Sequence, residues 1–208
     1  MAPIMGRPFL EWQMDYWIEQ GIRNFILSVG FRYQDIQTHF SHRYRSASIQ
    51  YVIENTPLGT GGALLMAIKK LELKNPLLLL NGDTFFEINL KHFDEFAVSR
   101  NAEWCISIFR SNENDRYMGL QFDSNSKLIA LKSDIKKTNQ YLNGGVYWVN
   151  PKSLERLKVE TGKFYSLENE LIPEMMMEGI RTYAFLGIGK FIDIGVPQDY
   201  LRAHKIIC

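Results

Sequence analysis

The sequence predicts an α/β fold in which a mixed, mainly parallel β-sheet is flanked by helices. Three observations predict it: helical and extended apolar patterns alternate through the first half, short apolar segments end at glycines or polar turns, and the second half adds strands around a turn-rich hairpin. The order strand, helix, strand, helix, strand is typical of a parallel sheet covered by helices. At 208 residues, a single domain spanning residues 1–208 is expected.

The first half alternates helices with strands. A helix is predicted from Phe9 to Gln20, because its apolar residues share one face and Gly21 follows as a stop signal. Leu77–Leu80 is a short apolar run after a proline, and its length favours a strand buried on both faces over a helix. The other predicted elements are strands at Phe25–Val29 and Ile49–Glu54, and helices from Tyr33 to Phe40 and through Leu64, Ile68 and Leu71.

The second half has a less regular pattern. Two apolar stretches, Leu120–Phe122 and Leu128–Leu131, flank a turn-rich segment and predict a hairpin. Ser166 is a candidate N-cap for a helix whose inner face includes Leu167 and Leu171. Further strands are predicted at 104–108, 145–149, 182–186 and 190–194, with a helix near 93–98. We therefore expect antiparallel additions to a parallel core.

Composition excludes several classes of protein. The net charge is +1 with acids and bases mixed, so the clustered basic face of a nucleic-acid-binding protein is absent. No apolar run reaches the length of a membrane span, and the first residues lack the apolar core of a signal peptide. Cys105 and Cys208 have no metal-ligand spacing, which favours a reduced, cytoplasmic protein. Trp12 and Trp17 suit either the core or a homo-oligomer interface.

Glycines cluster in the segment from Glu54 to Ala63, which joins a predicted strand to a predicted helix. Gly59, Gly61 and Gly62 permit close approach to a flat or charged ligand, and amides at a helix N-terminus favour an acceptor-rich partner. The segment is not a Walker loop, because no Lys-Ser or Lys-Thr pair follows the glycines. Considered alone, it is equally compatible with a tight connection that glycine eases into a helix.

Two aspartates lie at the ends of predicted strands that are far apart in the sequence. Asp83 follows Leu80-Asn81-Gly82, and Asp193 lies within the strand that ends near Ile194. Ligands of open α/β sheets bind beyond the carboxyl ends of the strands. Mg²⁺ usually takes one or two carboxylates plus substrate phosphates, so the pair is a candidate metal site. Either aspartate alone is better explained by a turn or a cap; their joint occurrence favours the metal.

A further candidate segment, Asn143-Gly144-Gly145, opens a predicted strand. Two glycines permit close approach there, and the Asn143 amide suits a hydroxyl-rich ligand. Glu168, in the first turn of the following helix, is a candidate acceptor for sugar hydroxyls. Considered separately, the glycines are better explained by a bulge or strand entry, and Glu168 by its interaction with the helix dipole.

Taken in this order, the segments resemble the sugar-phosphate nucleotidyltransferase family over essentially the whole chain. The combination is specific, whereas no single segment is. Within the family, the sequence looks most like D-glycero-α-D-manno-heptose 1-phosphate guanylyltransferases, with mannose-1-phosphate guanylyltransferases a close second. Pro57–Ala63 is similar to the family's base-binding loop, and Asn81–Asp83 to its first metal-aspartate motif. Asn143–Tyr147 is similar to the family's sugar-binding strand, and Asp193–Pro197 with Tyr200 to its second metal-aspartate motif.

The resemblance implies a Rossmann-like nucleotidyltransferase fold and transfer of a nucleotidyl group, GMP from GTP, to heptose 1-phosphate or mannose 1-phosphate. It implies Mg²⁺ as cofactor, and a nucleoside triphosphate and a sugar 1-phosphate as binding partners. The implied roles fall into three groups: Asp83 and Asp193 for catalysis and the metal; Glu54, Pro57, Gly59, Thr60 and Gly82 for the nucleotide; and Asn143, Gly144, Gly145 and Glu168 for the sugar.

Two departures from the family pattern bear on the activity. The family's Gly-rich triphosphate loop is not in this sequence. The sequence begins at a stretch that matches the residues after that loop. We therefore expect an N-terminally truncated domain in which the centre of the sheet lacks a strand. The lysine that meets the sugar phosphate is not identifiable among Lys132, Lys136 and Lys137. The alternative function is therefore a catalytically impaired module that binds nucleotide or sugar phosphate. A glycosyltransferase is disfavoured, because Asn81-Gly82-Asp83 is not an Asp-x-Asp motif.

Overall fold

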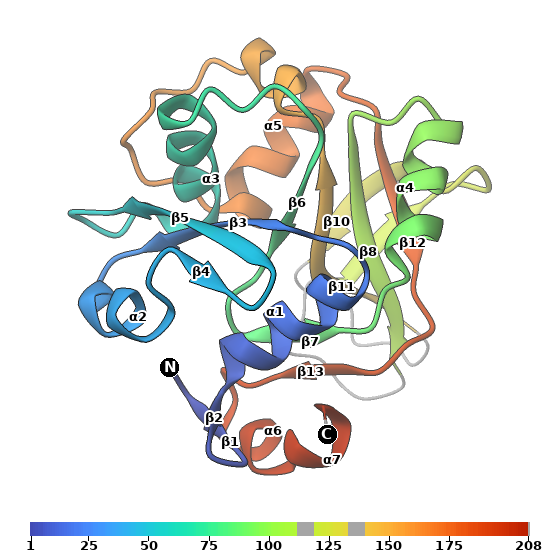
Figure 1. Cartoon of the computed structure of the whole chain (residues 1–208). Coiled ribbons are helices and arrows are strands. Elements are labelled where there is room, and N and C mark those ends of the chain that lie inside the picture. Colours follow the sequence, from blue (N-terminus) through green and yellow to red (C-terminus); the bar gives the residue numbers. More distant parts are fainter. Residues whose placement is uncertain (112–118, 133–139, 208) are drawn as a thin grey trace.

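The computed structural model describes residues 1–111, 119–132 and 140–207, and it has the predicted α/β architecture with mixed sheets flanked by helices (Figure 1). No helix among these residues is long and apolar enough to cross a membrane. The helices are α1 (Phe9–Glu19), α2 (Tyr33–Phe40), α3 (Gly59–Lys70), α4 (Leu90–Ser99), η1 (Pro151–Arg156), η2 (Leu167–Leu171), α5 (Ile172–Met177), α6 (Pro197–Arg202) and α7 (His204–Ile207).

A three-stranded sheet is built from the first half of the chain. Its order is β3 (Asn24–Val29), β5 (Ala47–Ile53) and β4 (Arg43–Tyr44), with β3 parallel to β5 and β4 antiparallel to it. Met14 and Ile18 of α1 pack with Phe40 of α2 and with Ile49 of β5 in one apolar cluster. The alternation of helices and strands expected for this half is therefore present.

A larger sheet forms the centre of the molecule around one long strand. Its order is β10 (Leu128–Lys132), β9 (Gly119–Phe122), β11 (Gln140–Val149), β8 (Trp104–Ser111) and β12 (Thr182–Leu186), and β6 (Leu77–Leu80) also pairs with β11. Alternate residues of β8 and β11 face opposite sides. Tyr147 joins the core under α3 and α5, whereas Trp148 joins the core under α4. The predicted hairpin is the antiparallel β9–β10 pair.

The pairing differs in one respect from the expected mainly parallel sheet. Within the part of the chain that the structure describes, β3–β5 and β8–β12 are the parallel ladders, and the other ladders are antiparallel. The reason is β11, which is antiparallel to both β6 and β8. Strands β6, β8 and β12 thus share a direction, but β11 lies between β6 and β8 instead of a parallel strand.

Strands β3 and β6 are both sheet edges in the described part of the chain. There, β3 pairs with β5 and β6 pairs with β11, and neither pairs with the other. Residues of both strands line one cleft of about 1840 Å³. Leu77–Leu80 is therefore half-buried and not, as predicted, buried on both faces. In the described residues, β3 and β6 therefore face this cleft without pairing with each other.

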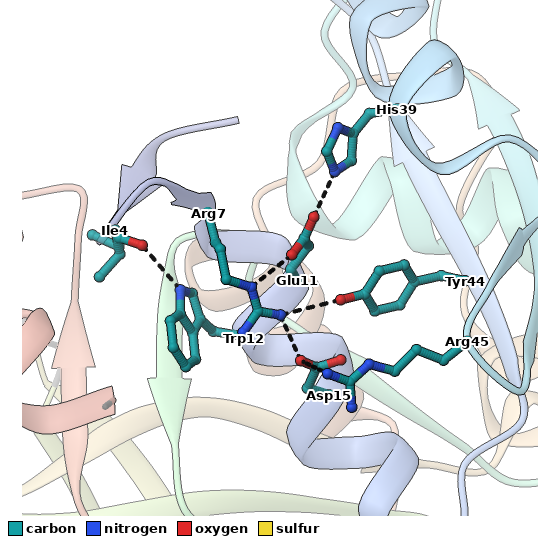
Figure 2. A network of polar contacts seen from close by, with 8 residues as sticks. All are labelled: Ile4, Arg7, Glu11, Trp12, Asp15, His39, Tyr44 and Arg45. Carbon is teal, nitrogen blue, oxygen red and sulfur yellow. Dashed lines mark hydrogen bonds and ion pairs between the residues drawn. The ribbon is translucent and has the colours of Figure 1, made fainter.

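A polar network connects α1 to the three-stranded sheet (Figure 2). The Arg7 guanidinium contacts Glu11 at 2.8 Å and Asp15 at 2.6 Å. Asp15 also pairs with Arg45, which follows β4, and Glu11 contacts His39 of α2 at 2.6 Å. The carboxylates are mostly buried, so these contacts are screened less than exposed ion pairs and fix α1 against α2 and β4.

The two ends of the chain are held together beside a short two-stranded sheet (Figure 1). This sheet pairs β7 (Thr84–Phe86) with β13 (Phe191–Asp193) in antiparallel fashion. The Tyr200 hydroxyl of α6 donates to the Pro3 carbonyl at 2.7 Å, where β1 (Pro3–Ile4) forms a hairpin with β2 (Arg7–Pro8). Sequence analysis did not predict β7, although its pairing with β13 brings distant parts of the chain together.

Gln13 of α1 fixes the turn between β6 and β7. Its side chain is 5% exposed, and its amide nitrogen donates to the carbonyls of Asn81 at 2.9 Å and Thr84 at 2.7 Å. On the other side, the Asn81 amide donates to the Gly145 carbonyl of β11 at 2.9 Å. The turn that contains Asp83 is therefore held by α1 and by β11.

Replacing Gln13 with leucine should destabilise the protein by about 2 to 3 kcal/mol, because two carbonyls would lose their donor. Chemical denaturation measures the change as a lower free energy of unfolding. Gln50→Leu, at an exposed position of β5, is the matched control and should stay within about 0.5 kcal/mol of the wild type. Equal effects of the two variants would contradict the role assigned to Gln13.

Candidate active site

The pairing of β7 with β13 brings Asp83 and Asp193 together. Asp193 lies opposite Thr84 in the ladder, and the Ile194 amide donates to the Asp83 carbonyl at 2.8 Å. Both carboxylates flank Gly195: a Cβ at that position would lie 3.0 Å from Asp193 Oδ1 and 3.2 Å from Asp83 Oδ2. The two acids lie side by side although 110 positions separate them in the sequence (193 − 83).

The electrostatics of this pair favour a bound cation. Burial raises the pKa of Asp83 above its usual value, and the nearby carboxylates of Asp193 and Glu168 raise it further. A cation between these groups would offset both the lost hydration and the mutual repulsion.

The donor set suits a hard divalent ion that also binds substrate. Within the described ranges, no group of three or more His, Cys, Asp or Glu residues is arranged to enclose a metal. Asp83 and Asp193 therefore offer two carboxylates, and the lack of a side chain at Gly195 leaves space beside them. Mg²⁺ is commonly held in this way, by one or two carboxylates with water and phosphate oxygens completing the shell.

The glycines of the 54–63 segment pack against the protein itself. The amides of Gly61 and Gly62 both donate to the Tyr165 carbonyl, at 3.0 and 3.2 Å, and the Tyr165 amide donates to the Leu58 carbonyl at 2.8 Å. A Cβ at Gly59 would lie 2.6 Å from the same Tyr165 carbonyl. Close backbone packing on Tyr165 is thus one role of these glycines, as a tight connection would require.

Other parts of this segment line the large cleft. Glu54, Pro57, Gly59 and Thr60 are on its wall, and the Glu54 carboxylate accepts a hydrogen bond from the Leu58 amide at 3.0 Å. Gly82, Asp83 and Glu168 line the same cleft. Its volume of about 1840 Å³ exceeds the roughly 300–1,000 Å³ of most small-molecule sites, because it continues along the edges of β3 and β6.

Gly144 and Gly145 allow β11 to approach the β6–β7 turn. A Cβ at Gly144 would lie 2.4 Å from the Phe86 ring, and one at Gly145 would lie 2.4 Å from Thr84 Oγ1. The register of β11 against β8 shifts between Asn143 and Tyr147. The structure thus contains the bulge that sequence analysis offered as the simpler explanation.

Asn143 and Glu168 meet through a residue that sequence analysis did not select. The Tyr147 hydroxyl donates to Glu168 Oε1 at 2.8 Å, and Asn143 Nδ2 donates to the Tyr147 hydroxyl at 2.7 Å. Ser166 caps η2 by accepting from the Asn169 amide at 3.1 Å, which fixes the turn carrying Glu168. Residues two or four apart on a strand lie on the same face. The spacing of Asn143 and Tyr147 could therefore have indicated that their side chains are neighbours.

The candidate lysines for the sugar phosphate are not placed by the structure. Lys136 and Lys137 lie outside the described residues. Lys132 ends β10 by its backbone, and its side chain is likewise outside the description.

Comparison with known proteins gives concordant matches. The model of the nucleotidyl transferase family matches residues 1–208. A D-glycero-α-D-manno-heptose 1-phosphate guanylyltransferase of Aneurinibacillus thermoaerophilus is 37% identical, over 99% of this chain and 87% of that protein. The Drosophila melanogaster mannose-1-phosphate guanylyltransferase catalytic subunit beta is 28% identical, over 97% of this chain and 54% of that protein. The crystal structure of HddC from Yersinia pseudotuberculosis complexed with GMP-PN superposes with a TM-score of 0.83 at 29% identity, covering 99% of this chain and 88% of that one.

Gly145→Ala should destabilise the protein more than Gly179→Ala. Both glycines have positive φ, +69° and +67°, so alanine costs each about 1–2 kcal/mol of backbone strain. A Cβ at Gly179 meets nothing within 4 Å, whereas one at Gly145 collides with Thr84. Denaturant unfolding of the two variants separates strain from collision, and equal losses would contradict the packing argument.

Asp83→Asn should raise the melting temperature at neutral pH in chelator-treated, metal-free buffer. The pKa of Asp83 is higher in the folded protein than its usual value of 3.8 in an unfolded chain. The wild type therefore loses stability as the pH rises from about 3.8 through the folded-state pKa of Asp83. The gain of the variant should therefore disappear as pH falls below about 3.8. Divalent cation should raise the melting temperature of the wild type but not that of Asp83→Asn.

Asp35→Asn is the control for this experiment. Asp35 is exposed in the first turn of α2 and pairs with Arg32, so its loss should lower stability slightly if at all. The proposed electrostatics of Asp83 would be contradicted if the melting temperature of the wild type changed neither with pH in this range nor on addition of a divalent cation.

Proposed function

Because this chain belongs to the nucleotidyl transferase family, we propose that it transfers GMP from GTP to a sugar 1-phosphate, giving a GDP-sugar and pyrophosphate. The proposed acceptor is D-glycero-α-D-manno-heptose 1-phosphate, with mannose 1-phosphate as the alternative. The relatives named above support this choice, since their names state guanylyl transfer to these two sugar phosphates.

The observation that carries the proposal is the pair of carboxylates beside the cleft. Asp83 lines the cleft, and both Asp83 and Asp193 are within reach of Gly195. Phosphoryl and nucleotidyl transfers need positioning and neutralisation of negative charge more than covalent chemistry from the protein. An acidic pair beside a cleft that can take a nucleotide is suited to that task.

In the proposed reaction, an oxygen of the sugar 1-phosphate attacks the α-phosphorus of GTP in line. A new phosphorus–oxygen bond forms as the bond to the β-phosphate oxygen breaks, and pyrophosphate leaves with that electron pair. No general base is needed, because the attacking phosphate oxygen is already anionic. The work of the protein is to hold the two phosphates against each other in the absence of bulk water.

Asp83 and Asp193 would hold the divalent cation, which we take to be Mg²⁺. When bound, such an ion neutralises phosphate charge and stabilises the transition state. Backbone contacts hold the two residues in place: the Gly195 amide donates to the carboxylate of Asp193 at Oδ1, 2.8 Å away, and the Asp83 backbone carbonyl accepts from the Ile194 amide.

The nucleotide would lie against the wall that carries Glu54, Pro57, Gly59 and Thr60, and reach Gly82. The Glu54 carboxylate is oriented by the Leu58 amide, and a carboxylate only accepts hydrogen bonds. Guanine offers a 2-amino donor, so an oriented acceptor at this wall suits that base. HddC, which was crystallised with GMP-PN, supports a guanine nucleotide in this fold.

The sugar would be held by Asn143 and Glu168, next to the backbone of Gly144 and Gly145. The Asn143 amide and the Glu168 carboxylate form a connected donor and acceptor set, which suits a ligand with several hydroxyls. Glu168 lines the cleft close enough to Asp83 to raise its pKa, so sugar and cation would be neighbours. We place this chemistry in the cytoplasm, because the free, buried thiol of Cys105 suits a reducing compartment.

Pyrophosphate release from GTP and heptose 1-phosphate should require Mg²⁺ and should fall at least a hundredfold in Asp83→Asn and Asp193→Asn, since each removes half of the acidic pair. A coupled pyrophosphate assay over a panel of four nucleoside triphosphates and several sugar 1-phosphates measures this. Asp35→Asn, on exposed α2, should keep wild-type turnover.

Full turnover by either site variant would contradict the metal assignment. A wild type that binds GTP or sugar 1-phosphate by calorimetry, but releases no pyrophosphate with any pair, would instead identify a binding module. The same panel therefore decides between the two functions and identifies the base and the sugar.

A further inference from the structure

We propose that Tyr147 is the positioning residue that holds Glu168 for the sugar substrate. The inference rests on the function proposed above and assigns a part in it to a residue with no role so far. Tyr147 is 0% exposed, so it acts through the side chains it touches and not on the substrate.

The Tyr147 hydroxyl is the centre of a three-residue hydrogen-bond network. It donates to Glu168 Oε1 at 2.8 Å and accepts from Asn143 Nδ2 at 2.7 Å. A phenol has one proton to donate, so Glu168 receives that proton while the oxygen accepts from Asn143. The network joins η2 to β11.

The environment keeps the phenol a donor. Burial raises its pKa well above the usual value, and the charge of Glu168 raises it further. The proton therefore stays on Tyr147 throughout any practical assay range and remains directed at one oxygen of Glu168. Hydrogen bonds to a charged acceptor are stronger than neutral ones, so this contact fixes the carboxylate rotamer.

The fixed rotamer leaves one carboxylate oxygen for a ligand. In the described part of the chain, the hydrogen bonds to Glu168 from Tyr147 and Asn143 both go to Oε1. Glu168 lines the cleft, so Oε2 is the acceptor available to a sugar hydroxyl. Without the phenol, the carboxylate would sample several rotamers, and each bound sugar would have to select the productive one.

The strand of Tyr147, β11, also holds the turn that bears Asp83. Asn81 lies two residues before Asp83, and its backbone is held by Gln13 and by Gly145 of β11. The sugar-side carboxylate and the turn of the proposed metal site are thus both positioned by β11. A purely structural tyrosine would contribute to folding but would not distinguish between the two substrates.

Tyr147→Phe tests the proposal because it removes only the hydroxyl. The KM for the sugar 1-phosphate should rise about tenfold, the loss expected for one hydrogen bond to a charged group, while the KM for GTP stays within about twofold. Tyr141→Phe is the matched control on the same strand, where the ring packs against Phe122, and it should leave both constants unchanged. Equal changes in the two KM values, or none, would overturn the proposal.

A double-mutant cycle tests whether Tyr147 acts through Glu168. In a Glu168→Ala background, Tyr147→Phe should produce no further rise in the sugar-phosphate KM, whereas an additional tenfold rise would overturn the proposal. If Tyr147→Phe does not fold, as judged by circular dichroism, Glu168→Asp takes its place. Its shorter side chain cannot keep the 2.8 Å contact, and an unchanged sugar-phosphate KM would then contradict the proposal.

The test also separates this inference from the proposed function. If the wild type releases pyrophosphate and Tyr147→Phe behaves like it, the function stands and the inference fails. If the wild type releases none, the function fails, and calorimetry with heptose 1-phosphate and mannose 1-phosphate decides the inference. A roughly tenfold weaker Kd in Tyr147→Phe would then support it, and an equal Kd would overturn it.

Discussion

The close approach of β11 to the turn between β6 and β7 is the constraint on which the site depends. Gly144 and Gly145 leave no side chain between this strand and the Phe86 and Thr84 side chains. The Asn81 amide can therefore bond the Gly145 carbonyl, and the turn that follows takes Asp83 to the start of β7. From there, pairing with β13 brings in Asp193. A single methyl group at either glycine would disturb that whole sequence of contacts.

Glycines and polar side chains have different tasks in this molecule. The glycines of the 59–62 segment and of β11 permit protein to pack on protein, mostly backbone against backbone or ring. In the proposed function, the chemistry falls to side chains that these contacts bring together, namely the two aspartates, Glu54, and the group around Glu168. In this protein the glycine-rich segments therefore mark where the chain is crowded, and the proposed ligand-binding groups lie next to them.

The sequence allowed most of the regular elements to be predicted, because their apolar periodicity is strong. Helix α1 and the strands β3, β8 and β12 follow from it, as does the cap at Ser166. Strand β7 could not be predicted, since its three residues are too few for a period. The antiparallel placement of β11 depends on long-range pairing that leaves no local signal.

The candidate site shows the same division between local and distant information. Asp83 and Asp193 could be selected because each lies at or just beyond the end of an apolar strand, and their meeting was inferred from where strand ends lie. Tyr147 was not selected, because an aromatic residue on a strand usually means core, and it is indeed in the core. Its hydrogen bonds depend on Glu168, 21 positions later, which strand alternation cannot foresee.

The unpaired edges of β3 and β6 determine how mechanical load is transmitted between the two sheets on either side of the cleft. The wall with Glu54 follows β5 in one sheet, and the wall with Asp83 follows β6 in the other. In the described residues no backbone ladder joins these two sheets. Side-chain packing by α1 and α3 carries the connection, and the Arg7 network holds α1 against α2 and β4. A ligand that contacts both walls would link the two sheets, and they would then move together as one rigid unit.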